Sequence, residues 1–116
     1  GHMHADCRIR ELLMDCGIAA LDIPAGLGAL QAEATQLGAT DGPSAIVKIR
    51  NALVHPRVAN RERVSTTSPA GRGQALDLGL WYLEMVLLRL FNYSGIYYNR
   101  WTHGRVRDCR RRVPWA

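Results

Sequence analysis

Apolar residues recur every three or four positions along most of the 116-residue chain, which is the spacing of amphipathic helices. Four such segments are bounded mostly by glycine or proline, the residues that commonly end or begin helices. They cover residues 6–16, 24–37, 42–55 and 73–93. No segment shows the alternation of apolar and polar residues that predicts a strand. The pattern predicts an all-α fold, a small antiparallel four-helix bundle in a single domain.

The segment 73–93 is the longest, and it is apolar around much of its circumference. One stripe along it, called the leucine stripe below, consists of Leu76, Leu80, Leu83, Leu87 and Leu90. A helix of this composition is either central to a bundle or shared with a second subunit. Asp77 and Glu84 lie on a different face, and they are either ordinary solvated carboxylates or acidic partners of a site elsewhere.

The chain divides into three parts. Residues 1–3 look like a cloning scar, residues 4–100 hold the predicted bundle, and residues 101–116 form an arginine-rich tail. No signal peptide is apparent, and the longest apolar stretch contains Glu84 and Arg89. We therefore expect no membrane span and a cytoplasmic location. Three cysteines, an odd number, argue against a disulfide framework.

The net charge is +5, and 14 of the 15 basic residues are arginine. Six arginines lie in the last 17 residues, where Asp108 is the only acidic residue. Such clustering favours a polyanionic partner, because arginine binds phosphate groups through both charge and hydrogen bonds. The alternative is a solvated surface tail with no partner.

The end of the third segment carries the most chemically suggestive pattern in the chain, Arg50-Asn51-Ala52-Leu53-Val54-His55. On a helix, Asn51 and His55 share one face, while Arg50 lies about 100° away. Arginine can hold a phosphate in bidentate fashion, and histidine can move a proton near pH 7. Cleavage of a phosphodiester without a metal needs these two groups. The alternative is a surface Arg50 and a His55 that interacts with the helix macrodipole.

An all-α domain in which this pattern closes the third helix before a long final helix resembles the HEPN superfamily. The resemblance covers approximately residues 6–100. It implies a metal-independent endoribonuclease that works as a homodimer, with one composite site built from both copies and no metal or cofactor. Arg50 would hold the scissile phosphate, and His55 would act as general base or acid while the ribose 2′-hydroxyl attacks. Asn51 would orient the phosphate or His55.

The resemblance also implies a setting for the domain. We expect the effector end of a bacterial toxin or antiphage protein, acting together with the N-terminal region of that parent protein. Further RNA contacts are expected at four arginines: Arg57, Arg100, Arg105 and Arg107. Tyr97, Tyr98 and Trp101 either stack on bases or pack the end of the bundle.

Two other functions stay open. One is a non-catalytic module that dimerises its parent protein through the apolar face around residues 80–90 and binds a nucleotide or RNA at most. The other is a nucleic-acid-binding domain that uses the arginines of residues 105–116, with Arg50 playing no part.

Overall fold

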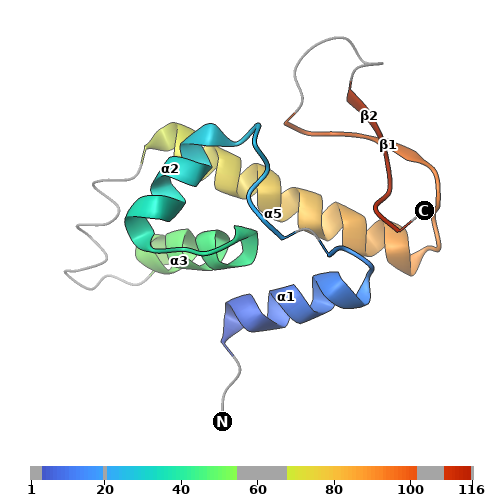
Figure 1. The fold of residues 1–116 in the computed structure, drawn as a ribbon, viewed down its shortest axis with the longest axis horizontal. Coiled ribbons are helices and arrows are strands. Elements are labelled where there is room, and N and C mark those ends of the chain that lie inside the picture. Colours follow the sequence, from blue (N-terminus) through green and yellow to red (C-terminus); the bar gives the residue numbers. More distant parts are fainter. Residues whose placement is uncertain (1–3, 20, 55–67, 102–108, 116) are drawn as a thin grey trace.

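A computed structural model of the chain describes residues 4–19, 21–54, 68–101 and 109–115. These residues fold into four helices and one β-hairpin (Figure 1). The helices are α1 (Ala5–Asp15), α2 (Gly28–Leu37), α3 (Gly42–Val54) and α5 (Pro69–Leu90), and the strands are β1 (Ile96–Tyr98) and β2 (Arg110–Arg112). The prediction of a mainly helical domain is confirmed in this coarse form, and the hairpin is an addition to it.

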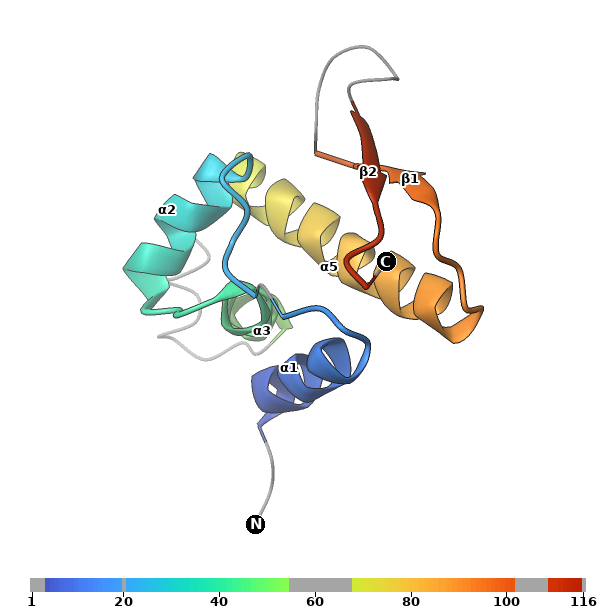
Figure 2. The same cartoon turned by 45° about the vertical axis from the view of Figure 1, so that its right-hand side comes forward.

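The long helix α5 runs through the domain, and the other helices lie on one side of it (Figure 1, Figure 2). Both α2 and α3 pack against α5, and α1 packs chiefly against α3. The β-hairpin stands beside the C-terminal half of α5, away from α2 and α3. The positions of α2, α3 and the hairpin are therefore defined relative to α5, and α1 is held mainly through α3.

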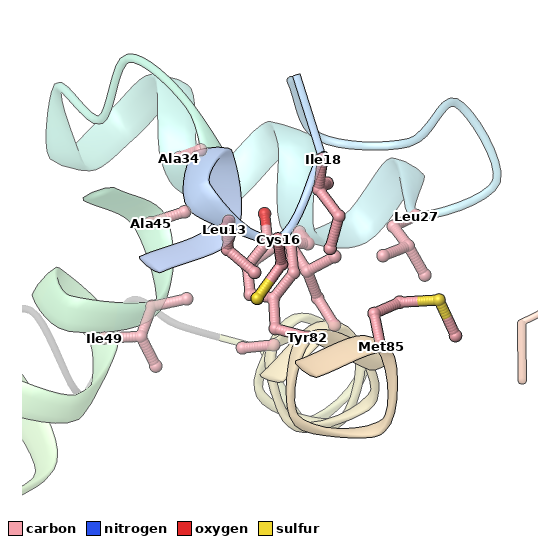
Figure 3. Packing of buried hydrophobic residues seen from close by; sticks show 12 residues of the cluster. Leu13, Cys16, Ile18, Leu27, Ala34, Ala45, Ile49, Tyr82 and Met85 are labelled. Carbon is pink, nitrogen blue, oxygen red and sulfur yellow. The ribbon is translucent and has the colours of Figure 1, made fainter. Parts of the chain in front are cut away.

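The core is mainly aliphatic and lies between α5 and the three shorter helices (Figure 3). Leu13 of α1, Leu30 of α2 and Ile49 of α3 are all buried there. The buried residues of α5 are spaced three or four apart: Gly71, Ala75, Leu78, Tyr82 and Met85. Full burial of a leucine-sized side chain contributes about 1.5–3 kcal/mol, so this side of α5 fixes the helix against its neighbours.

The helices α2 and α5 satisfy each other's N-terminal backbone groups, which have no partner within their own helix. The Leu30 N–H in the first turn of α2 donates to the Gln74 side chain of α5 at 2.9 Å. In return, the buried Glu33 of α2 accepts the Ser68 N–H at 2.7 Å through Oε1. The Ser68 hydroxyl then caps α5 by accepting the Gly71 N–H at 3.0 Å. These bonds fix where the two helices begin relative to each other.

Two predicted helix starts differ from the structure. The helix α2 begins at Gly28 and not at residue 24, because the preceding residues form a turn in which the Leu27 N–H donates to the Pro24 carbonyl at 2.9 Å. The helix α5 begins at Pro69 and not at residue 73, because Ser68 caps it and proline is favoured in the first turn.

The prediction that the chain contains no strand is wrong. The strands β1 and β2 pair in antiparallel register, with Ile96 opposite Arg112. Three residues are too few to show an alternating pattern, and a strand made only of arginine has no apolar position to reveal it. The residue after β2 holds the hairpin together, since Val113 is 2% exposed and its N–H donates to the Gly95 carbonyl at 3.2 Å. Part of the predicted arginine-rich tail is therefore a paired strand.

Asp41 joins α1 to α3. Its carboxylate accepts the Ser44 N–H at 3.0 Å, which caps the start of α3. It also accepts two hydrogen bonds from Arg10 of α1, at 2.7 and 3.0 Å. Burial raises the pKa of Asp41, but the hydrogen bonds from Arg10 and Ser44 outweigh it and hold the pKa below its ordinary value. The hydrogen bonds to Asp41 in turn raise the pKa of Arg10.

We expect Asp41→Ala to lower the free energy of unfolding by about 1–3 kcal/mol at pH 7, because it removes a helix cap and leaves Arg10 unpaired. The pKa of Asp41 is depressed in the folded state. Its stabilisation is therefore fully present above the pKa of the unfolded chain, about 3.9, and is lost as the pH falls through the folded pKa. Denaturant unfolding measured from neutral to acidic pH should show the difference between wild type and variant shrinking below about pH 4.

Asp6→Ala is the matched control. Asp6 also contacts Arg10, at 3.4 Å, but it does so within α1 and does not cap α3. We expect this variant to lose about 0.5 kcal/mol or less. Equal losses for the two variants, or an Asp41 effect that is the same at every pH, would contradict this account of the α1–α3 junction.

Candidate functional site along α3 and α5

The last turns of α3 carry the part of the predicted catalytic motif that the structure describes. Arg50 is exposed and Asn51 is half-buried. The Arg50 Nη1 donates to the Asn51 Oδ1 at 3.1 Å, so the two side chains lie together at the surface. The predicted acid or base, His55, and the predicted RNA contact Arg57 lie outside the described residues. The structure therefore brings together two of the three predicted catalytic residues.

A groove of about 310 Å³ lies between α3 and α5, beside Arg50. Its walls are apolar except for Arg50 and Arg72. The lining residues of α3 are Ile46, Ile49, Arg50, Leu53 and Val54, and those of α5 are Arg72, Ala75, Leu76, Gly79 and Leu80. A surface with so few polar groups suits contact with an apolar partner more than the positioning of a proton donor and acceptor.

Two further hollows lie along α5. One, of about 300 Å³, is lined by α1, α3 and α5, and the other, of about 340 Å³, is lined by the C-terminal half of α5 with Phe91 and Arg100. Three residues of α5 each line two of the three hollows: Gly79, Leu80 and Leu83. The hollows are therefore parts of one continuous apolar surface along α5.

The leucine stripe predicted from the sequence runs along this surface. The exposed fractions of its side chains are 63% for Leu76, 55% for Leu83, 45% for Leu87 and 71% for Leu90, and Leu80 is half-buried. The sequence left two roles open for the long helix, a central position in a bundle or contact with a second subunit. In the structure, the core uses the opposite side of α5 and the stripe stays exposed.

Arg100, a predicted RNA contact, is engaged within the domain. Its Nη2 donates to the Glu84 Oε2 at 3.0 Å. Glu84 is therefore a partner of Arg100. Arg50 and Arg100 line different hollows, and Arg105 and Arg107 lie outside the described residues. The structure does not place Arg100 beside Arg50, the predicted phosphate-binding residue.

The polar groups of the buried side chains Glu33 and Tyr82 contact other elements of the core. Glu33 accepts the N–H of Ser68, the residue that caps α5. Tyr82 lies against Gly42 at the start of α3, where burial raises the pKa of its hydroxyl. Over the described part of the chain, no three histidine, cysteine, aspartate or glutamate side chains come together as metal ligands would. In the same residues, no helix has the length and apolar character needed to cross a bilayer.

Comparison with known families gives a clear assignment. The family described as YopA C-terminal domain matches residues 1–110. The chain belongs to this family. The HEPN prediction is therefore wrong, because the matching family is a different one. A six-residue pattern at a helix end and an order of four helices occur in many helical domains, so they are too weak to identify a superfamily.

The chain is also similar to the SPbeta prophage-derived uncharacterized protein YopA of Bacillus subtilis (strain 168). The two are 36% identical over 75 residues, which cover 65% of this chain and 16% of that protein. The YopA protein is thus several times longer than the region it shares with this chain. No solved structure matches the chain.

The floor of the α3–α5 groove has room for a methyl group at Gly79. A Cβ there would meet Ile46 Cδ1 at 3.9 Å. We expect Gly79→Ala to raise the free energy of unfolding by about 0.5–1 kcal/mol, because alanine is the better helix former. Gly42→Ala is the contrasting variant and should destabilise the domain, since its Cβ would overlap the Tyr82 hydroxyl. Denaturant unfolding measures both, and a destabilised Gly79→Ala variant would contradict an open groove.

Proposed function

We propose that this domain is a non-catalytic association module that pairs with a second copy of itself through the leucine stripe. The observation that carries the proposal is that α5 has apolar residues on two opposite sides. One side forms the core of the domain, and the other is exposed. Contiguous exposed apolar surface of this kind is typical of interaction sites.

The two sides of α5 follow the same spacing. Each leucine of the stripe lies five residues after a buried residue of α5, which places it about 140° further around the helix at 100° per residue. The stripe has intervals of four, three, four and three residues. These are the intervals of the a and d positions of a coiled coil, whose side chains fit between those of a facing helix. The stripe is therefore suited to pack against another helix with the same repeat.

The exposed area is sufficient for pairing. Taking the exposed fractions of Leu76, Leu83, Leu87 and Leu90, burial of these side chains in both copies would contribute about 7–14 kcal/mol. Association of two bodies costs about 4–15 kcal/mol in lost freedom. A surplus of about 7 kcal/mol, which the upper part of the burial range leaves over the lower part of the association cost, corresponds to a dissociation constant of about 10 μM. We therefore expect a dimer that dissociates on dilution and not a permanent one.

A second copy of the chain is the partner that the stripe itself specifies. Two identical stripes related by a two-fold axis place leucine against leucine, as a symmetric interface requires. Glu84, which flanks the centre of the stripe, is already paired with Arg100 in its own domain. Pairing therefore does not bring two unneutralised glutamates together at the centre of the seam. In a longer parent protein, such pairing would join two copies of the remaining chain.

We expect the wild-type domain to sediment mostly as a dimer at tens of micromolar, since a surplus of about 7 kcal/mol corresponds to a dissociation constant of about 10 μM. Leu83→Glu should sediment as a monomer, because it places a carboxylate at the centre of an apolar seam, where burial of a charge costs several kcal/mol. The dissociation constant should rise by at least about 100-fold. Sedimentation velocity over a dilution series measures both proteins.

Met14→Glu provides the control, since Met14 is an exposed apolar side chain of α1 outside the stripe. This variant should remain dimeric, and circular dichroism should show that all three proteins keep their helices. A wild type that stays monomeric throughout the series would contradict the proposal. A Leu83→Glu variant that stays dimeric would show that the copies meet through another surface.

Cleavage of RNA by Arg50, Asn51 and His55 stays a prediction, now without the HEPN assignment behind it. The observation that favours it is local. Arg50 and Asn51 are hydrogen-bonded to each other near the end of a helix, and Arg50 is open to solvent. A planar guanidinium in such a position can bind a phosphate in bidentate fashion.

Incubation of a labelled mixed-sequence RNA with the domain in EDTA tests this prediction. Cleavage that leaves 2′,3′-cyclic phosphate ends should disappear in Arg50→Ala and His55→Ala, because they remove the charge stabilisation and the proton transfer. Arg8→Ala, which removes an exposed arginine of α1, should cleave like wild type. Cleavage that requires added metal would contradict the mechanism. If the wild type is dimeric and the RNA nevertheless stays intact, the association module remains the proposed function.

A further inference from the structure

One face of the β-hairpin combines an aromatic side chain with two arginines. In the ladder, Ile96 lies opposite Arg112 and Tyr98 lies opposite Arg110. Residues directly opposite each other in an antiparallel pair project from the same face, as do alternate residues of one strand. Ile96, Tyr98, Arg110 and Arg112 therefore share one face, called the hairpin face below. All four side chains are exposed.

The remaining side chain of β1 holds the hairpin to α5. The Trp81 Nε1 of α5 donates to the Tyr97 hydroxyl at 3.0 Å, and both side chains pack against the core. After β2, Val113 is buried, and the Trp115 Nε1 donates to the Tyr93 carbonyl at 2.7 Å. The two strands that carry the hairpin face are thus packed and hydrogen-bonded to the rest of the domain. These contacts fix the backbone positions from which the side chains of the hairpin face project.

Within the residues that the structure describes, no acidic side chain neutralises the positive charge of the hairpin face. Of the residues placed by the structure, none forms an ion pair with the guanidinium of Arg110 or Arg112. Beyond Glu84 the sequence contains one acidic residue, Asp108, which lies outside the described ranges. A shallow hollow of about 260 Å³ is lined by Ile96 and the three arginines of β2. This face therefore favours an anionic ligand.

We propose that the hairpin face binds a single-stranded nucleic acid, with a base stacked on Tyr98 and phosphates bound by Arg110 and Arg112. Proteins that bind single strands combine a positively charged surface along the backbone with aromatic rings on which bases stack. Alternate residues of a strand lie about 7 Å apart, so the two arginines can contact different phosphates of one flexible strand. A duplex keeps its base faces within the stack and offers Tyr98 no ring to contact.

The binding site is separate from the other candidate sites. None of its residues belongs to the leucine stripe or to the motif in α3. Two of its arginines belong to residues 105–116, for which the sequence leaves nucleic-acid binding open, and Tyr98 is one of the aromatic residues that could stack on bases. Arg100, a predicted RNA contact, is not part of it and is paired with Glu84. Single-strand binding therefore stands or falls independently of pairing and of RNA cleavage.

Fluorescence anisotropy with short labelled oligo(U) and oligo(dT), and with a duplex of equal length, tests the proposal on the whole chain. We expect Tyr98→Ala to weaken single-strand binding by about 5- to 150-fold, the range for loss of one base–aromatic contact. Tyr98→Phe keeps the ring and should bind like wild type. Replacement of Arg110 and Arg112 by alanine should weaken binding and reduce the slope of log K against log salt by about 0.7 per phosphate contact.

Arg8→Ala, which removes an exposed arginine from α1, is the matched control for charge. Tryptophan fluorescence shows whether each variant keeps Trp81 and Trp115 packed beside the hairpin.

Binding that is absent in wild type, unchanged in Tyr98→Ala or weakened equally by Arg8→Ala would overturn the proposal. Preferential binding to vesicles of anionic lipid would overturn it in favour of a membrane surface. Repetition with Leu83→Glu separates the two proposals, since a monomer that still binds single strands supports the hairpin face alone.

Discussion

The structure depends on one property of α5, which is apolar on two opposite sides. The side with Leu78, Tyr82 and Met85 forms the wall of the core against which α1, α2 and α3 are arranged. The side with the leucine stripe faces away from that core. Its N-terminal leucines border the hollows beside α1 and α3, yet four of the five leucines are at least 45% exposed. Apolar surface on the second side therefore favours a partner outside the domain, and the coiled-coil spacing of the leucines favours another helix of the same kind.

Polar contacts place the helices around this apolar framework. Glu33 and Gln74 join the starts of α2 and α5, and Asp41 joins α1 to the start of α3. These groups are engaged in structure, whereas several arginines are exposed. Arg50 lies near the end of α3, and Arg110 and Arg112 lie on the hairpin. We propose that α5 pairs one copy of the domain with a second copy, and that the hairpin face binds a single strand of nucleic acid.

The sequence predicts the parts of this structure in which the apolar spacing repeats over several helical turns. The four helices and the leucine stripe are long enough for their spacing to be recognised, although the side of α5 that enters the core is decided by packing with other helices. The hairpin could not be predicted, because β2 is three arginines and its position depends on the burial of Val113. The start of α5 depends on Glu33, a residue 35 positions away from Ser68. The motif around Arg50 was visible, but its likeness to HEPN rested on too few positions.

The measurement that tests the central claim most directly is the thermal unfolding midpoint as a function of protein concentration, for wild type and for Leu83→Glu. A domain that pairs through the leucine stripe is stabilised by association, so its midpoint should rise as the concentration increases. The Leu83→Glu midpoint should not change over the same range. A wild-type midpoint that is independent of concentration would contradict the claim that the exposed side of α5 is an interface between two copies of this domain.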